Sequence, residues 1–289
     1  MSYDRLCKAE DELCQEIDRL IRQSAEEDAV ADARYGSSRG ESIPNELKHR
    51  KSRLEKIRKA RQELEKEAAE QAQRCVIDTP AGTPKCEPPS LPKHQIARNT
   101  GGGIKASAQR NFTDPDSRIM KQGQSYVQAY NCQTVVDSAY QVIVAEAVTN
   151  HPADTHHLIP LLEETASNAA RYPENLTADA GYWTPNNPTY CESKSVNALI
   201  SPRQNLKREP KHLSQPQRLM CAKLENPGNR ALYRMRKAIV EPVYGQIKEC
   251  RGFRRFHLRG LQGASGEWHL VTLTHNILKL FRHAPHRRS

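Results

Sequence analysis

The chain has 289 residues, a formal net charge of +10 and a hydrophobic fraction of only 37%. This length allows one large domain or two modest ones, and the mean hydropathy of -0.80 is low for a fully packed protein. A basic balance of this size favours a polyanionic partner, most often nucleic acid, over charge that serves solubility alone.

The eight cysteines are scattered along the chain and form no C-x-x-C pair, so we expect reduced thiols rather than a disulfide framework or a zinc site. No apolar run approaches the roughly 18 residues of a membrane span. The N-terminus resembles neither a signal peptide nor a transit peptide. The sequence therefore predicts a cytoplasmic protein with no membrane partner.

Residues 1–74 consist almost entirely of helix-forming residues and are interrupted by "YGSSRGESIP". Apolar residues recur at helical spacing on both sides of the break: Leu6, Leu13, Ile17 and Leu20, then Leu47, Leu54, Ile57 and Leu64. Two narrow apolar seams predict an antiparallel helical hairpin of coiled-coil type, whose second helix starts at Ser42 or Pro44. Such an arm could grip DNA or a second subunit, or could act only as a solvated spacer.

Residues 75–110 are rich in proline and glycine, and this composition predicts a linker or a loosely draped segment. Residues 111–289 have an α/β pattern. Strands are predicted at 124–137 and 141–149, joined as a hairpin, and as short buried runs at 174–183 and 196–203. Helices are predicted at 154–171, with Leu158, Leu161 and Leu162 inward, at 229–250 after an Asn226 cap and Pro227, and at 266–284 with a wide core face. Strands interleaved with helices favour a mixed sheet with helices on its faces.

Asp179 stands at the end of the buried strand run "NLTAD", followed by a glycine and by Tyr182 and Trp183. Functional side chains gather at the carboxyl ends of strands in open α/β sheets, whereas an Asp before Gly is also an ordinary turn residue. The two aromatic residues could wall a site or stack on a base.

The helix "ALYRMRKAIVEPVYGQIKEC" has a predicted core face of Met235, Ile239, Val243 and Ile247. Glu241 lies on the opposite side and shares its azimuth with Arg234 and Lys248, with Lys237 one turn earlier. A carboxylate among cations indicates a phosphate-handling surface or a solvated salt-bridge ladder. Pro242 favours the first interpretation, because a proline within a helix costs about 3 kcal/mol or more.

The segment "KECRGFRRFHLRG" interleaves cations with Phe253 and Phe256, a pattern typical of nucleic-acid binding. The predicted DNA-binding residues are Lys237, Lys248, Arg251, Arg254, Arg255 and Arg259.

Several of these stretches, "TADAGYW", "YRMRKAIVEPVYGQIKECRGFRRFHLRG" and "GEWHLVTLTHNILKLFR", together resemble the DDE transposases of bacterial insertion sequences. The resemblance implies an RNase H-like fold that performs DNA transposition, a form of DNA recombination. It implies in-line phosphoryl transfer assisted by two Mg²⁺ or Mn²⁺ ions, with Asp179 and Glu241 as catalytic metal ligands. The implied partners are DNA at the transposon ends and target, and further copies of the chain.

The sequence departs from the family pattern at the first catalytic aspartate, since no strand resembling "DGTK" precedes the helical segment. We therefore expect the C-terminal part of a longer transposase with an incomplete catalytic domain over 111–289. Asp137 is the best substitute for the missing aspartate, and Asp116 is a second candidate. The alternatives are a catalytically inactive DNA-binding remnant that modulates a full-length enzyme, and a metal-dependent nuclease without strand transfer.

Overall fold

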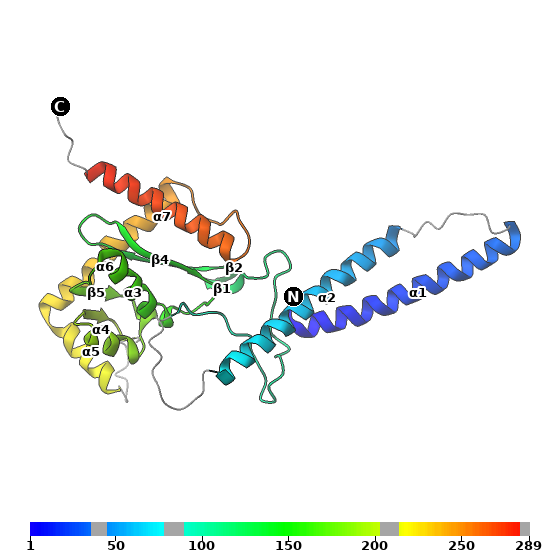
Figure 1. Cartoon of the computed structure of the whole chain (residues 1–289), viewed down its shortest axis with the longest axis horizontal. Coiled ribbons are helices and arrows are strands. Elements are labelled where there is room, and N and C mark those ends of the chain that lie inside the picture. The colour runs from blue at the N-terminus through cyan, green and yellow to red at the C-terminus, as the bar shows by residue number, and fades with distance from the viewer. Residues whose placement is uncertain (36–44, 78–89, 203–213, 284–289) are drawn as a thin grey trace. The chain divides into compact units, whose positions relative to one another are not determined.

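The computed structural model describes residues 1–35, 45–77, 90–202 and 214–283. The chain divides into two compact units (Figure 1). Unit 1 comprises Met1–Thr83 and Gln95–Pro115, and unit 2 comprises Pro84–His94 and Asp116–Ser289. Each unit has buried apolar clusters of its own, so each is described by itself.

Unit 1 is built on the long helices α1 (Tyr3–Tyr35) and α2 (Asn45–Ile77). Their polar contacts fix an antiparallel direction, because partners late on α1 are early on α2. The Tyr3 hydroxyl donates to Glu65 at 2.8 Å, whereas Arg50 forms an ion pair with Glu16. The predicted start of the second helix, at Ser42 or Pro44, lies outside the described residues.

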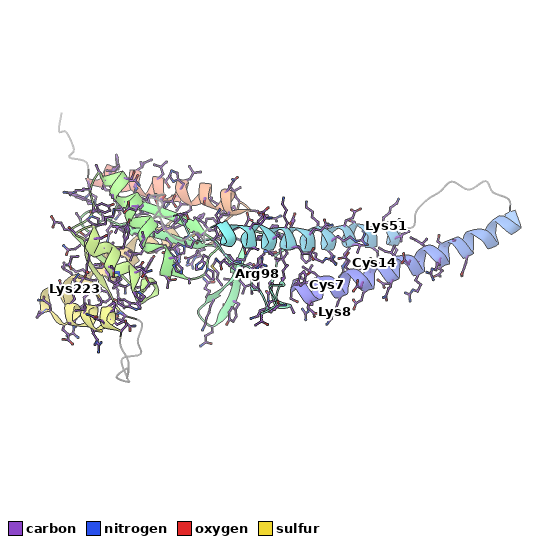
Figure 2. The ribbon with its side chains drawn as sticks, turned by 60° about the horizontal axis from the view of Figure 1, so that its bottom comes forward. Cys7, Lys8, Cys14, Lys51, Arg98 and Lys223 are labelled. Atoms are coloured by element: carbon purple, nitrogen blue, oxygen red, sulfur yellow. The ribbon has the colours of Figure 1, made fainter. Side chains whose placement is uncertain are left out.

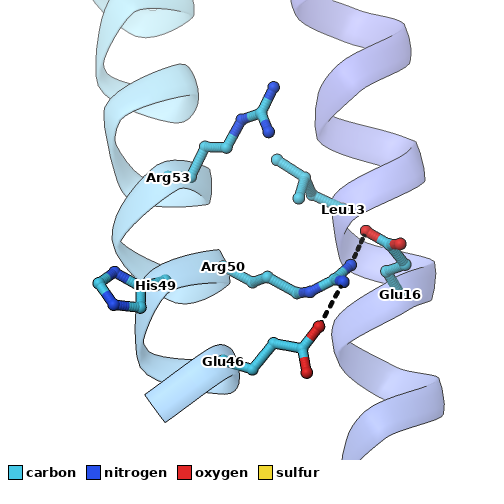
Figure 3. A pocket seen from close by; sticks show the side chains of 6 residues that line it. All are labelled: Leu13, Glu16, Glu46, His49, Arg50 and Arg53. Carbon is cyan, nitrogen blue, oxygen red and sulfur yellow. Dashed lines mark hydrogen bonds and ion pairs between the residues drawn. The ribbon is translucent and has the colours of Figure 1, made fainter.

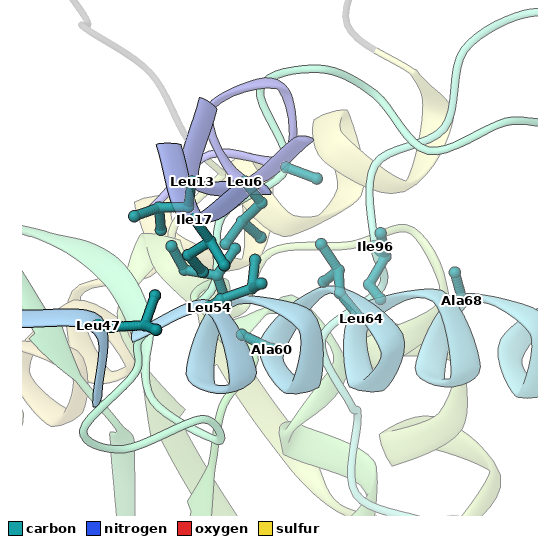
Figure 4. Close-up of a cluster of buried hydrophobic side chains, with 11 residues drawn as sticks. Leu6, Leu13, Ile17, Leu47, Leu54, Ala60, Leu64, Ala68 and Ile96 are labelled. Carbon is teal, nitrogen blue, oxygen red and sulfur yellow. The ribbon is translucent and has the colours of Figure 1, made fainter. Parts of the chain in front are cut away.

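A continuous apolar seam joins the two helices (Figure 4). Leu6 is fully buried and Leu64 is 2% exposed, although both helices are otherwise covered by charge. The buried side chains of the seam come from the positions that recur at helical spacing: Leu6, Leu13, Ile17, Leu47, Leu54, Ile57, Ala60, Leu64 and Ala68. Burial of this stripe is what makes two polar helices stable together.

Residues 95–110 pack onto the helices of unit 1, where composition predicts a loosely draped segment. Ile96 and Ala108 are buried in the same seam. Arg110 forms ion pairs with Glu63 and Glu67 at 3.0 and 2.9 Å. The backbone N–H groups of Tyr3 and Asp4 also donate to carbonyls of this segment, at Ala108 and Ala106. Its proline and glycine content gives no sign of this packing.

Unit 2 is a mixed α/β structure, as the sequence predicts. Among the described residues, its strands pair in three separate two-stranded sheets and not in the one mixed sheet that the sequence predicts. Two pairs are antiparallel, β1 (Arg118–Gln122) with β2 (Ser125–Ala129) and β3 (Asn131–Val136) with β4 (Ile143–Thr149). The third pair, β5 (Asn175–Ala178) with β6 (Asn197–Ile200), is parallel. The single strand predicted over 124–137 is wrong, because Tyr130 separates β2 from β3 and packs edge-to-face on Phe256 with ring centroids 6.0 Å apart.

Helices are present at the three predicted places, but the structure also contains two helices that the sequence does not predict, Asn186–Ser193 and Gln215–Glu225, and several short helical turns. The helical elements of unit 2 are η1 (Asp154–His156), α3 (Leu158–Ala169), η2 (Ala180–Tyr182), α4 (Asn186–Ser193), α5 (Gln215–Glu225), α6 (Pro227–Gly245), the π-helical turn η3 (Gln246–Cys250) and α7 (Leu261–His283). Helices α3 and α7 cover opposite faces of β4 (Figure 1). Ala145 and Ala147 pack on α3, whereas Val148 packs against α6 and α7.

The N-terminus of α6 is formed as predicted, with the Asn226 side chain accepting hydrogen bonds from the backbone N–H groups of Gly228 and Asn229. Val243 and Ile247 are fully buried, but Met235 is 52% exposed, so its assignment to the core face is wrong. A step of four residues advances about 40° beyond a full turn. Over three such steps, Met235 drifts about 120° away from the azimuth of Ile247.

The last helix, α7, buries one face and exposes another. Trp268, Val271 and His275 are buried. The prediction that its wide apolar face is packed in the core is therefore only partly correct, because five apolar side chains are exposed: Leu270, Leu273, Ile277, Leu280 and Phe281.

Candidate active site

Asp179 directly follows β5, at the carboxyl end of the strand where the sequence predicts it. It caps the short helix η2, and its Oδ1 accepts a hydrogen bond from the backbone N–H of Gly181 at 2.8 Å. Its side chain is nevertheless 48% exposed. Asp179 therefore caps the turn and still has a carboxylate that solvent can reach.

A second carboxylate, Asp154, lies beside this turn and was not singled out from the sequence. It opens η1, and its Oδ1 accepts hydrogen bonds from Asn131 Nδ2 and Gln133 Nε2, each at 2.8 Å. Both amides come from β3, and Gln133 is only 5% exposed. The start of β3 therefore fixes the orientation of the Asp154 carboxylate.

Gly181 lies close to both carboxylates. A Cβ atom built on Gly181 would lie 2.7 Å from Asp154 Oδ2 and 2.9 Å from Asp179 Oδ1. Real Cβ atoms do not approach oxygen this closely, so any side chain here would displace one carboxylate or both. The absence of a side chain allows two acidic oxygens to converge on one point.

Tyr182 closes one side of this arrangement. Its hydroxyl donates a hydrogen bond to Gln133 Oε1. Burial raises the pKa of Tyr182, and the negative charges of Asp154 and Asp179 raise it further. Of the two roles that the sequence left open for this aromatic residue, walling the site fits its position better than stacking on a base. Trp183 likewise packs against a buried apolar cluster.

Helix α6 packs against β5 and brings Arg236 to Asp179. Arg236 Nη1 lies 4.0 Å from Asp179 Oδ2, and its guanidinium lies over the Tyr233 ring at 5.4 Å. Glu241 is exposed and stands five residues further on, about 7.5 Å along the helix axis. Lys237, the predicted cation of this turn, is also exposed. Nothing in the local pattern distinguishes Arg236 from Lys237, because only packing decides which cation faces β5.

Beyond Glu241, the helix remains attached to β3. The Thr134 hydroxyl donates to the hydroxyl of Tyr244 at 3.1 Å, and burial raises the pKa of Tyr244 to about 12. Lys248 Nζ lies 5.3 Å from the centre of the Tyr244 ring. The π-helical turn η3 begins here, and such turns often occur at functional sites.

The substitutes considered for a first catalytic aspartate are engaged elsewhere. Both oxygens of Asp137 accept backbone N–H groups of the hairpin turn, from Ala139 and Tyr140. Asp137 also lies roughly 13 Å beyond Gln133 along the strand direction, at about 3.3 Å per residue. Asp116 accepts a hydrogen bond from the backbone N–H of Leu261, at the start of α7. Asp154, and neither of these two, is the carboxylate beside Asp179.

The predicted DNA-binding segment has two classes of cation. Arg251 donates to the carbonyl of Val271 and to Thr274, and Arg254 forms an ion pair with Glu249. Lys248, Arg255 and Arg259 are exposed. The interleaved aromatic residues face inward. The ring centroids of Phe253 and Phe256 lie 5.5 Å apart, and both rings pack in the buried cluster that contains Trp268. They anchor the segment to α7 and leave its charges outward.

The oxygen donors at Gly181 fit a hard divalent cation in chemical type, because Mg²⁺ and Mn²⁺ prefer carboxylate oxygens. One oxygen of each carboxylate lies close to Gly181, where a Cβ atom would crowd both. Within the described ranges, no group of three or more His, Cys, Asp and Glu side chains is arranged to hold a metal ion. The residues present therefore offer two converging carboxylates rather than a complete triad.

Features of unit 1 do not add to this chemistry. A depression between α1 and α2 is lined by Leu13, Glu16, Glu46, His49, Arg50 and Arg53 (Figure 3). Its central cation, Arg50, is already neutralised by Glu16 and Glu46. Cys7 and Cys14 lie on α1 (Figure 2), and the six cysteines with described side chains are free thiols. In the part of the chain that the structure describes, no helix has the length and apolar character needed to cross a membrane.

Comparison with known proteins gives one assignment. Residues 95–277 match the family model described as a transposase DDE domain. No curated protein and no solved structure has a significant match to the chain. The match includes Asp154, Asp179, Arg236 and Glu241 and spans well over half of the 289 residues. The chain therefore belongs to the DDE transposase family.

Proposed function

We propose that the chain performs DNA transposition by metal-dependent phosphoryl transfer, with Asp179 and Glu241 as carboxylate ligands in an RNase H-like catalytic domain over 111–289. Family membership implies DNA binding and transposition. The observation that carries the proposal is an exposed Asp179 at the carboxyl end of β5, against which the Glu241 helix packs. Residues 1–74 would form an arm that grips DNA or a second copy of the chain, and residues 75–110 would connect the arm to the catalytic domain.

The side chains around Asp179 would have different roles. Asp179 and Glu241 would hold the cation, and the guanidinium of Arg236 would attract a substrate phosphate toward Asp179. Tyr182 and Gln133 would keep the turn fixed through their mutual hydrogen bond. A bound Mg²⁺ or Mn²⁺ would supply Lewis-acid stabilisation of the charge on the transferring phosphate. Preorganised charge of this kind is commonly the largest contribution to catalysis.

The outward cations of the 248–259 segment would hold the DNA backbone. Lys248, Arg255 and Arg259 are exposed, and Arg254 is exposed in its pair with Glu249. Arg251 would act mainly by fixing the segment to α7, because its guanidinium binds Val271 and Thr274. Together with Lys237, these residues form the proposed DNA-binding surface.

A metal-dependent nicking assay on DNA containing the transposon ends tests the proposal. Asp179→Asn and Glu241→Gln should each reduce the nicking rate by about 100-fold or more, because each removes preorganised negative charge at the reacting centre. DNA affinity should remain near that of the unmodified chain. Glu192→Gln, at an exposed carboxylate on α4, is the matched control and should nick normally.

The same assay separates the alternatives. Nicking without strand joining would identify a nuclease. DNA binding with no nicking in any divalent cation would identify a binding remnant that modulates a complete enzyme. Normal nicking by Glu241→Gln would remove Glu241 from the active site.

A further inference from the structure

We infer that Asp154 is a direct ligand of the divalent cation at Asp179, and supplies the carboxylate that Asp137 and Asp116 do not. This inference rests on the proposed function, because it concerns the same cation. Its first basis is convergence, since Asp154 Oδ2 and Asp179 Oδ1 lie 2.7 and 2.9 Å from the single point that a Gly181 Cβ would occupy.

The second basis is orientation. The two amide hydrogen bonds from Asn131 and Gln133 both go to Asp154 Oδ1, so Oδ2 is the oxygen that faces Gly181. Ligating carboxylates are commonly held in this way by hydrogen bonds to the oxygen that does not bind the metal. Gln133 is nearly fully buried and is itself held by Tyr182, so the support is rigid.

The third basis is charge. Two carboxylates that converge on one point repel each other unless a cation lies nearby. The nearest cationic group on α6 is Arg236, 4.0 Å from the far oxygen, Asp179 Oδ2. Among the described residues, Arg236 forms an ion pair with Asp179 and not with Asp154, whose Oδ2 lies on the Gly181 side. Asp154 therefore has both the orientation and the electrostatic reason to bind a metal ion.

Mn²⁺ binding to the full-length chain, measured by electron paramagnetic resonance without DNA, tests the assignment directly. Asp154→Asn keeps an oxygen that can accept the Asn131 and Gln133 hydrogen bonds but removes the charge. We expect Asp154→Asn and Asp179→Asn each to weaken Mn²⁺ binding by about 10- to 100-fold or more, at least the loss typical of residues that only support a metal ligand. Asp137→Asn is the matched control, and its Mn²⁺ affinity should be unchanged.

The outcomes distinguish this inference from the proposed function. If Asp179→Asn weakens Mn²⁺ binding and Asp154→Asn does not, Asp154 is no ligand, whereas the proposed function stands. Absence of saturable Mn²⁺ binding by the unmodified chain would overturn both.

A second measurement needs no variant and therefore does not depend on variant folding. Fe²⁺ bound in place of Mg²⁺, with ascorbate and peroxide, generates hydroxyl radicals that cut the backbone close to the metal. Cuts near both Asp154 and Gly181 are expected, and competition by Mg²⁺ should suppress them. Cuts confined to other segments would overturn the assignment.

Discussion

Gly181 occupies a position where a single methyl group would disturb two carboxylates. We expect Gly181→Ala to lower the free energy of unfolding by about 1–3 kcal/mol, the usual cost of forcing extra atoms into a packed place. Displacing both oxygens should also abolish saturable Mn²⁺ binding. Urea unfolding monitored by tryptophan fluorescence gives the first quantity.

Gly245 provides the matched control for this substitution. It lies at the end of α6 with helical backbone angles, and a Cβ there would meet nothing within 4 Å. Gly245→Ala should raise the free energy of unfolding by up to about 1 kcal/mol, because alanine has the higher helix propensity. Equal effects of the two substitutions would contradict the packing argument at Gly181.

Two histidines of unit 2 make its stability depend on pH. Burial, together with the nearby Arg118 and His151, lowers the pKa of His94 to about 4. Burial also lowers the pKa of His157, whose Nε2 lies 2.7 Å from the Thr149 hydroxyl oxygen. Unfolded histidines titrate near pH 6.5, so between about pH 6.5 and 4 the unfolded chain binds more protons than the folded one.

Stability should therefore be constant above about pH 6.5 and fall as the pH drops toward 4. The melting temperature measured by tryptophan fluorescence at pH 7, 6 and 5 checks this expectation. His94→Gln should flatten the decline of the melting temperature. His49 is an exposed histidine on α2, so His49→Gln should leave that decline unchanged. A melting temperature that does not change over this range would contradict the assignment of neutral buried histidines.

At the scale of elements, the segment 248–259 should act as a surface for DNA backbone. Each phosphate contact contributes about -0.9 to the slope of log affinity against log salt concentration. Arg254→Ala together with Arg255→Ala should flatten that slope by nearly 2. Arg171→Ala removes an exposed cation after α3 and serves as the control. An unchanged slope in the double variant would mean that the segment is only a solvated face.

The sequence predicts elements best where one strong local pattern determines them. The seams of α1 and α2 and the Asn226 cap of α6 depend on residues within about two helical turns of one another, and the structure contains both. At Tyr130 the chain changes its pairing partner, since β2 pairs with β1 and β3 pairs with β4. The local pattern of residues 124–137 does not show which strand each part pairs with, so the sequence predicts one strand where the structure has two.

Local sequence patterns also predict only part of the candidate site. Asp179 could be predicted because it ends a strand. Asp154 and Arg236 could not, since Asp154 is placed by two amides of β3 and Arg236 by the packing of α6 on β5. An acidic residue that opens a helix after a strand is the only local signal of Asp154, and many ordinary helix starts share it.

At the scale of the whole molecule, the two units should unfold as separate transitions, because each has its own apolar core. Both tryptophans, Trp183 and Trp268, belong to unit 2. Tryptophan fluorescence therefore reports unit 2, whereas far-UV circular dichroism also reports the long helices of unit 1. Chains with more than one core commonly depart from two-state behaviour.

Leu64 and Leu162 are matched probes of the two cores, since each is 2% exposed in its own unit. Leucine-to-alanine substitutions in cores cost about 2–5 kcal/mol. In urea, Leu64→Ala should lower the midpoint of the circular dichroism change that belongs to α1 and α2 and leave the fluorescence midpoint in place. Leu162→Ala should lower the fluorescence midpoint. If Leu64→Ala moves both signals together, the units unfold as one cooperative structure and the division into two units has no thermodynamic counterpart.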